Sequence, residues 1–140
     1  MMPDDDSGAA TPAGPVRVIP LTAEASFALC QLAASLDLDH QRIDLAGCGS
    51  KEEFLRRVAD ALDFPEWFGG NWDAFYDCLA DLSWRPARGY VLVLENPDSM
   101  RRVAPESLDT ALAILGDAAA YWAGRGIPFR AFVGAAAISD

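Results

Sequence analysis

Two aspartates one helical turn apart are the side chains of this 140-residue chain best suited to chemistry. Asp73 and Asp77 stand four residues apart with Tyr76 between them, so a helix would place both carboxylates on one face. Paired carboxylates act as general acid and base in glycoside hydrolysis, where their surroundings hold the two pKa values apart. No feature of the neighbouring sequence would separate the pKa values of this pair. We therefore expect binding rather than enzymatic activity.

Other catalytic or metal-binding sets are not expected either. The chain has one histidine and three cysteines, Cys30, Cys48 and Cys78, and these lack the spacing of a zinc site. Cys78 falls on the core side of its predicted helix, where a packed thiol is inert. We see no Ser/His/Asp set and no glycine-rich phosphate loop in the sequence. We therefore expect no catalytic residues, no cofactor and no metal ion.

Aromatic and acidic residues concentrate around the aspartate pair. Residues 63–84 hold five acidic residues and no basic residue. The same stretch contains Trp67, Phe68, Trp72 and Tyr76, and so short a segment cannot easily bury all four. Exposed aromatic side chains ringed by acids indicate a binding site for a basic partner. The alternative is an ordinary solvated helix surface. Even at a binding site we expect Phe68 in the core rather than in contact with a partner, and Trp72 suits either place.

A short helix is expected to position these groups. Gly69 and Gly70 permit a turn before it, and Asn71 is a favoured residue for capping its first turn. On a helical wheel one side is apolar and consists of Phe75, Cys78, Leu79 and Leu82. The opposite side consists of Asp73, Tyr76, Asp77 and Ala80. The pattern predicts one face for the core and a separate face for a partner.

Strands that alternate with helices are predicted for the rest of the chain. Strands are expected at residues 40–45, 90–94 and 129–133, and the longer helices at 51–62 and 105–123. Alternation of this kind predicts right-handed crossovers and a small parallel sheet. Ahead of these elements, a strand at 16–21 and a helix at 22–35 are interpreted as an added βα unit. The apolar residues of that helix are Phe27, Leu29, Cys30, Leu32, Ala33 and Leu36.

The charge of the chain limits its partners. Twenty-one acidic residues against eleven basic ones leave a formal net charge of −10 at pH 7. Nucleic acids and anionic membranes are polyanions, so we expect neither as a partner, whereas a basic protein would suit this charge. A charge selected for solubility alone is the alternative. The acidic N-terminus does not resemble a signal peptide and no run is long enough to span a membrane, so we expect a cytoplasmic protein.

The stretch from Phe64 to Leu79, FPEWFGGNWDAFYDCL, resembles the signature of the barstar family, the intracellular inhibitors of secreted barnase-type ribonucleases. That signature combines Pro-Glu, two aromatic residues, glycine, asparagine, Asp-Ala, an aromatic residue and Asp-Cys-Leu. The later Leu92–Glu95 is similar to the family's central strand, and the similarity covers roughly His40–Gly134. The resemblance implies an α/β fold with a small three-stranded parallel sheet flanked by helices. It also implies a one-to-one complex in which carboxylates occupy the positions of substrate phosphate in the ribonuclease active site.

The resemblance implies roles for individual residues. Asp77 matches the acid that goes deepest into the ribonuclease site, and Asp73 matches an acid at the rim. Trp67 stands where the family usually has a tyrosine that stacks near the enzyme's catalytic histidine. The other residues expected to bind the partner are Asn71, Tyr76, Gly69, Trp72 and Trp84.

The chain also departs from the family pattern. The segment from Asp81 to Gly89 is longer than in the type member, which leaves open whether Trp84 matches the family's interface tryptophan. An acidic contact on the last long helix falls on Tyr121, so we expect that ion pair to be absent. The family's second cysteine is replaced by Ile127. Such differences affect which ribonuclease is bound, because specificity follows these contacts.

Three regions are expected along the chain: a disordered leader at 1–15, a βα extension at 16–39 and a barstar-like domain at 40–140. We expect a monomer when the protein is free, and a role as an antitoxin or immunity protein. The alternative is a barstar-like adaptor or regulator that binds another protein and has no ribonuclease target.

Overall fold

A computed structural model describes residues 14–135, so nearly all of the expected leader at 1–15 and the last residues of the chain lie outside it. The described part has an α/β fold. In chain order its elements are β2 (Val16–Ile19), α2 (Ala23–Ser35), β3 (Asp39–Asp44), α3 (Lys51–Leu62), α4 (Trp72–Asp81), β4 (Tyr90–Glu95), α5 (Asp98–Val103), α6 (Pro105–Ala123) and β5 (Phe129–Gly134). None of these helices is long and apolar enough to cross a membrane.

The four strands form one parallel sheet in the order β2-β5-β4-β3. The expectation of three strands is therefore wrong in number, because β2 pairs with β5 and adds a fourth strand at the edge. Backbone N–H groups of β5 and the residue after it reach β2 and Pro15: Ala131 donates to Pro15 and Ala135 to Ile19, at 2.8 and 2.7 Å. The central strand β4 is buried from Tyr90 to Leu94, as its continuous apolar run predicts.

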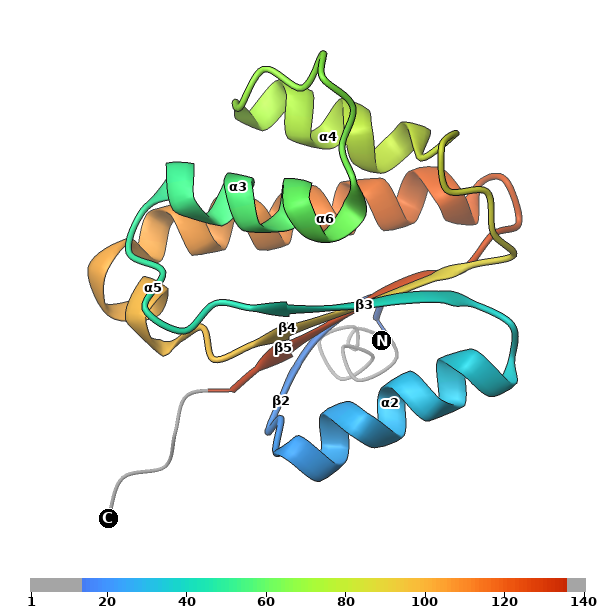
Figure 1. The fold of residues 1–140 in the computed structure, drawn as a ribbon, viewed down its shortest axis with the longest axis horizontal. Coiled ribbons are helices and arrows are strands. Elements are labelled where there is room, and N and C mark those ends of the chain that lie inside the picture. Colours follow the sequence, from blue (N-terminus) through green and yellow to red (C-terminus); the bar gives the residue numbers. More distant parts are fainter. Residues whose placement is uncertain (1–13, 136–140) are drawn as a thin grey trace, which may run out of the picture.

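Helices cover both faces of the sheet (Figure 1). α3 and α6 pack on one face, and α2 packs on the other against β3 and β4. α4 lies on the outer side of α3 and α6, away from the sheet, and it packs chiefly against α6. One side of α4 therefore belongs to the core, and its other side faces away from the rest of the molecule.

Local sequence signals place the helix boundaries. The Ser50 hydroxyl accepts a hydrogen bond from the Glu53 N–H at 3.1 Å, so α3 begins as its capping residues predict. Pro105 occupies the first turn of α6, where its missing N–H costs nothing. Both helices have the boundaries expected from the sequence.

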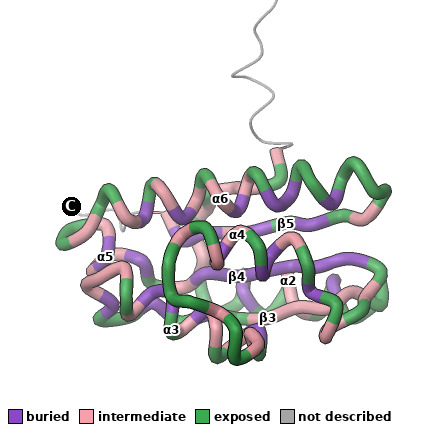
Figure 2. Tube along the Cα trace, turned by 90° about the horizontal axis from the view of Figure 1, so that it is seen from above, coloured by how far each residue is buried: buried purple, intermediate pink, exposed green. Residues whose placement is uncertain are grey.

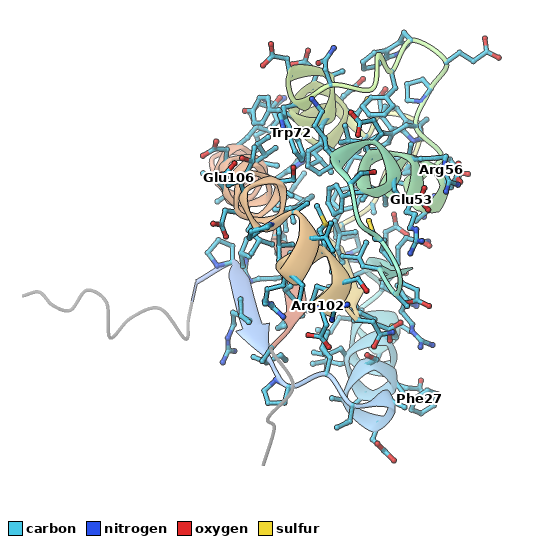
Figure 3. The ribbon with its side chains drawn as sticks, turned by 90° about the vertical axis from the view of Figure 1, so that its left-hand side faces the viewer. Phe27, Glu53, Arg56, Trp72, Arg102 and Glu106 are labelled. Carbon is cyan, nitrogen blue, oxygen red and sulfur yellow. The ribbon has the colours of Figure 1, made fainter. Side chains whose placement is uncertain are left out.

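α2 packs on the sheet through only some of its apolar residues. Ser26 and Ala33 are buried, and the half-buried Leu29 and Cys30 complete the contacting stripe. Three of its apolar residues are instead more than half exposed: Phe27, Leu32 and Leu36. Figure 3 shows Phe27 pointing away from the sheet. Apolar residues surround this helix, so the sequence alone could not indicate which side meets the sheet.

Candidate protein-binding site

The two faces of α4 are divided as the helical wheel predicts. Phe75, Cys78 and Leu79 are fully buried, whereas Asp73 and Asp77 are exposed. The Asn71 side chain accepts a hydrogen bond from the Ala74 N–H at 2.8 Å and begins the helix. Figure 2 looks onto this layer and shows that the chain entering α4 is largely exposed. The acidic face of α4 is therefore available to a partner.

The buried side of α4 is fixed by aromatic packing and one buried hydrogen bond. The Phe75 ring meets Phe54 edge to face, with centroids 5.7 Å apart, and lies 5.9 Å from Trp72. The indole Nε1–H of Trp122 on α6 donates to the Leu79 carbonyl at 2.8 Å. A buried donor and acceptor that satisfy each other hold α4 in register with α6.

A groove of about 570 Å³ lies between α4 and α6. Its lining combines three carboxylates with apolar and aromatic surface and consists of Trp72, Asp73, Tyr76, Asp77, Ile114 and Asp117. Four of these residues are among the predicted partner-binding residues. Ile114 and Asp117, from α6, were not predicted. A concave surface with this lining suits the insertion of cationic side chains, since carboxylates and aromatic faces both attract them.

The loop before α4 carries the other predicted residues. Trp67 is 56% exposed. The neighbouring Phe68 is half-buried, and the centroid of its ring lies 5.0 Å from that of the Phe64 ring. Gly70 has φ of +71°, a backbone conformation that favours glycine. Gly69 is exposed beside Asn71. The loop therefore presents Trp67 outward and turns the chain into α4.

Trp72 serves both the core and the groove. Its ring lies 6.2 Å from Phe54 and under the Lys51 ammonium, which is 5.7 Å from the ring centroid. The side chain is half-buried and also lines the groove. In Figure 3 it lies at the end of the molecule opposite Phe27. Trp72 is thus partly in the core, and its contact with a partner stays a prediction.

Trp84 follows the end of α4 in the chain, and its ring packs against the ring of Trp67. It is half-buried, and its Nε1–H donates to the Leu62 carbonyl at 2.9 Å. Its ring meets the Trp67 ring edge to face, with centroids 6.4 Å apart. The structure thus brings Trp84 to the same end of the molecule as the other predicted residues.

Cys78 lies on the buried side of α4. Burial raises the pKa of the Cys78 thiol to about 11, and Asp77 and Asp81 act in the same direction. The thiol is therefore protonated at neutral pH and unsuited to nucleophilic attack. Within residues 14–135, no group of three or more potential ligands among His, Cys, Asp and Glu could hold a metal ion.

The family model of Barstar (barnase inhibitor) matches residues 38–134. That match covers more than half of the chain and includes α4, the loop before it and three of the four strands. The chain belongs to the barstar family. The family resemblance seen in Phe64–Leu79 is thereby confirmed. A comparison with curated proteins gives no match. β2 and α2 precede the barstar match, so the fourth strand comes from outside it.

The barstar pattern does not identify Asp117 as a candidate binding residue. The acidic contact expected on the last long helix of the family falls on Tyr121. The Tyr121 ring lies under the Arg125 guanidinium, whose carbon is 5.2 Å from the ring centroid. Asp117 precedes it by four residues, about one helical turn, and lines the groove beside Asp73 and Asp77. The sequence feature that could have indicated Asp117 is an acidic residue one helical turn before Tyr121, the position of the family's acidic contact. That feature becomes informative only when α6 is known to lie beside α4.

Proposed function

We propose that this protein binds and blocks the active site of a basic, barnase-type ribonuclease in a one-to-one complex. Membership of a family described as barnase inhibitors supports this function. The observation that carries the proposal is the groove between α4 and α6, where three carboxylates surround half-buried aromatic rings. Carboxylates in such a groove can replace substrate phosphates against arginine, lysine and histidine side chains.

Each part of the site has a role in this proposal. Asp77 enters deepest, and Asp73 contacts the rim of the ribonuclease site. Trp67, Trp72 and Tyr76 supply aromatic contact area that excludes water around the charged pairs. Asn71 and Gly69 shape the entry to α4, and Trp84 completes the set of residues proposed for partner binding. The net charge of −10 would steer a basic enzyme toward this surface.

An inhibition assay tests the proposal. The purified protein is titrated into a barnase-type ribonuclease that cleaves RNA with a preference for guanine, and the mass of the complex is measured in parallel. We expect cleavage to stop at one equivalent, and a monomer to convert to a one-to-one complex. Absence of both inhibition and complex with basic ribonucleases, including any encoded beside this protein's gene, would contradict the proposal.

A barstar-like adaptor or regulator without a ribonuclease target is the second candidate. It is favoured by α2, which lies outside the family match and leaves Phe27, Leu32 and Leu36 exposed. Exposed apolar side chains of this kind suit a protein contact. If the first candidate holds, an antitoxin or immunity role in the cytoplasm is the proposed setting, since such an inhibitor would protect the cell that makes the enzyme.

Asp117→Asn is expected to weaken ribonuclease binding by about fivefold, because it removes one exposed carboxylate from the groove but keeps the shape of the side chain. Asp109→Asn is the matched control, since Asp109 is an exposed acid of α6 outside the groove. Dissociation constants from calorimetry measure both effects. Equal effects of the two substitutions would show that only overall charge matters.

A further inference from the structure

The segment between α4 and β4 is held in place by Arg85. Its guanidinium donates two hydrogen bonds to the two carboxylate oxygens of Asp39, at 2.8 and 2.9 Å, and a third to Asp63 at 2.9 Å. The Arg85 carbonyl accepts a hydrogen bond from the Tyr90 hydroxyl at 2.8 Å. The Arg85 side chain is only 16% exposed. A two-pronged contact of this kind fixes geometry as well as charge, so the segment is a rigid part of the fold.

We call the contacts of Arg85 with Asp39 and Asp63 the Arg85 clamp. The residue before Arg85, Trp84, is also held in a defined orientation. Its indole N–H is bound to the carbonyl of the buried Leu62, at the end of α3. Its ring and the Phe64 ring form an edge-to-face pair, with a centroid distance of 6.1 Å and an interplanar angle of 85°. Trp84 is therefore connected to α3 through its N–H and to the loop before α4 through its ring.

Trp67 packs its exposed ring against this fixed indole. The two ring planes are at 85°, with centroids 6.4 Å apart, which is a favourable edge-to-face arrangement. Among the described residues, Trp84 provides the one aromatic contact found for Trp67. A side chain that is 56% exposed would otherwise lose much rotational freedom when a partner binds it.

We propose that Trp84, held by Arg85, is a positioning residue that sets the orientation of Trp67 before the partner arrives. This inference rests on the ribonuclease-binding function proposed above. In this role Trp84 contributes to affinity through Trp67, separately from any direct contact that Trp84 itself makes with the ribonuclease. Ordering one large side chain in advance is worth roughly threefold to tenfold in affinity.

A double-mutant cycle with a barnase-type ribonuclease tests this role. Trp84→Leu is expected to weaken binding by threefold to tenfold when Trp67 is present, and by less than twofold in a Trp67→Ala background. Equal weakening in both backgrounds would mean that Trp84 contacts the ribonuclease directly, and would overturn the proposal. No weakening in either background would also overturn it.

A second measurement needs no ribonuclease. The protein is labelled with 5-fluorotryptophan, and the fluorine resonance of Trp67 is assigned with Trp67→Phe. Trp84→Leu is expected to narrow this resonance and shift it toward that of free tryptophan, while urea unfolding confirms that the variant is folded. Should Trp84→Leu fail to fold, Trp84→Phe serves instead, since it keeps a ring but loses the bond to Leu62. An unchanged resonance in the folded variant would overturn the positioning role.

Arg85 and Arg88 provide a matched pair of variants in the same segment. Arg85→Met is expected to alter the Trp67 resonance in the same direction as Trp84→Leu, because it releases the clamp. Arg88 is exposed, and Arg88→Met removes the same charge without affecting the clamp, so the resonance should stay as it is. Equal effects of the two substitutions would overturn the role of Arg85. If the wild-type protein binds no ribonuclease, the proposed function fails, and the fluorine measurement still decides whether Trp84 orders Trp67.

Discussion

Replacing Asp77 with alanine is expected to weaken ribonuclease binding by at least about 2 kcal/mol, or about thirtyfold. The Asp77 carboxylate is exposed in the free protein and lines the groove. In the complex it would lose its water and face a cationic site, so its removal leaves buried charges on the enzyme without a partner. The free energy of unfolding should change by less than about 0.5 kcal/mol, because the side chain is on the surface.

Asp81→Ala is the matched control for this prediction. Asp81 is an exposed acid at the end of the same helix, and it is outside the groove. We expect the control to change the dissociation constant by less than threefold. Calorimetry and urea unfolding on both variants separate binding from stability. The interface role of Asp77 would be contradicted if both substitutions had the same effect, or if Asp77→Ala reduced stability as much as binding.

Replacing Phe75 with alanine is expected to lower the free energy of unfolding by about 3–5 kcal/mol. The Phe75 side chain is completely buried and packs against Phe54, Phe64 and Trp72. Its removal would leave a cavity between α3 and α4. Urea-induced unfolding, followed by circular dichroism, measures the loss.

Phe75→Leu provides the comparison, because a large apolar side chain should reduce the loss to about 1–3 kcal/mol. A loss below about 1 kcal/mol for Phe75→Ala would contradict the placement of this residue in the core. Together with Asp77→Ala, these variants examine the two sides of one helix. We expect the fold to depend on one side and the partner to depend on the other.

Local signals were sufficient to predict most elements of this fold. The starts of α3 and α6 follow from Ser50 and Pro105, because N-caps and first-turn prolines act within one turn. The packing face of α2 could not be predicted in the same way, since its apolar residues surround the helix. The strand β2 was itself expected from local sequence, but its pairing with β5 was not, because most of the chain separates the two strands.

The candidate site was likewise predictable only where its residues are close together in the sequence. Asp73 and Asp77 were predicted because both belong to one short helix, and their spacing determines their shared face. Asp117 required knowledge that α6 lies beside α4. The Arg85 clamp joins residues 46 and 22 positions away, and sequence spacing gives no indication of such contacts. Long-range placement of charged groups is therefore the part that only the structure supplied.

β2 also determines how this sheet meets its surroundings. The strand has four residues and is bracketed by Pro15 and Pro20, which have no backbone N–H to offer a neighbouring strand. Without β2, the six residues of β5 would form an open edge, and such edges recruit strands from other molecules. β2 therefore covers the edge of β5, and we expect its own short, proline-flanked edge to be a poor site for strand addition. A shortened protein limited to residues 38–134 would keep the candidate binding groove and leave the edge of β5 uncovered.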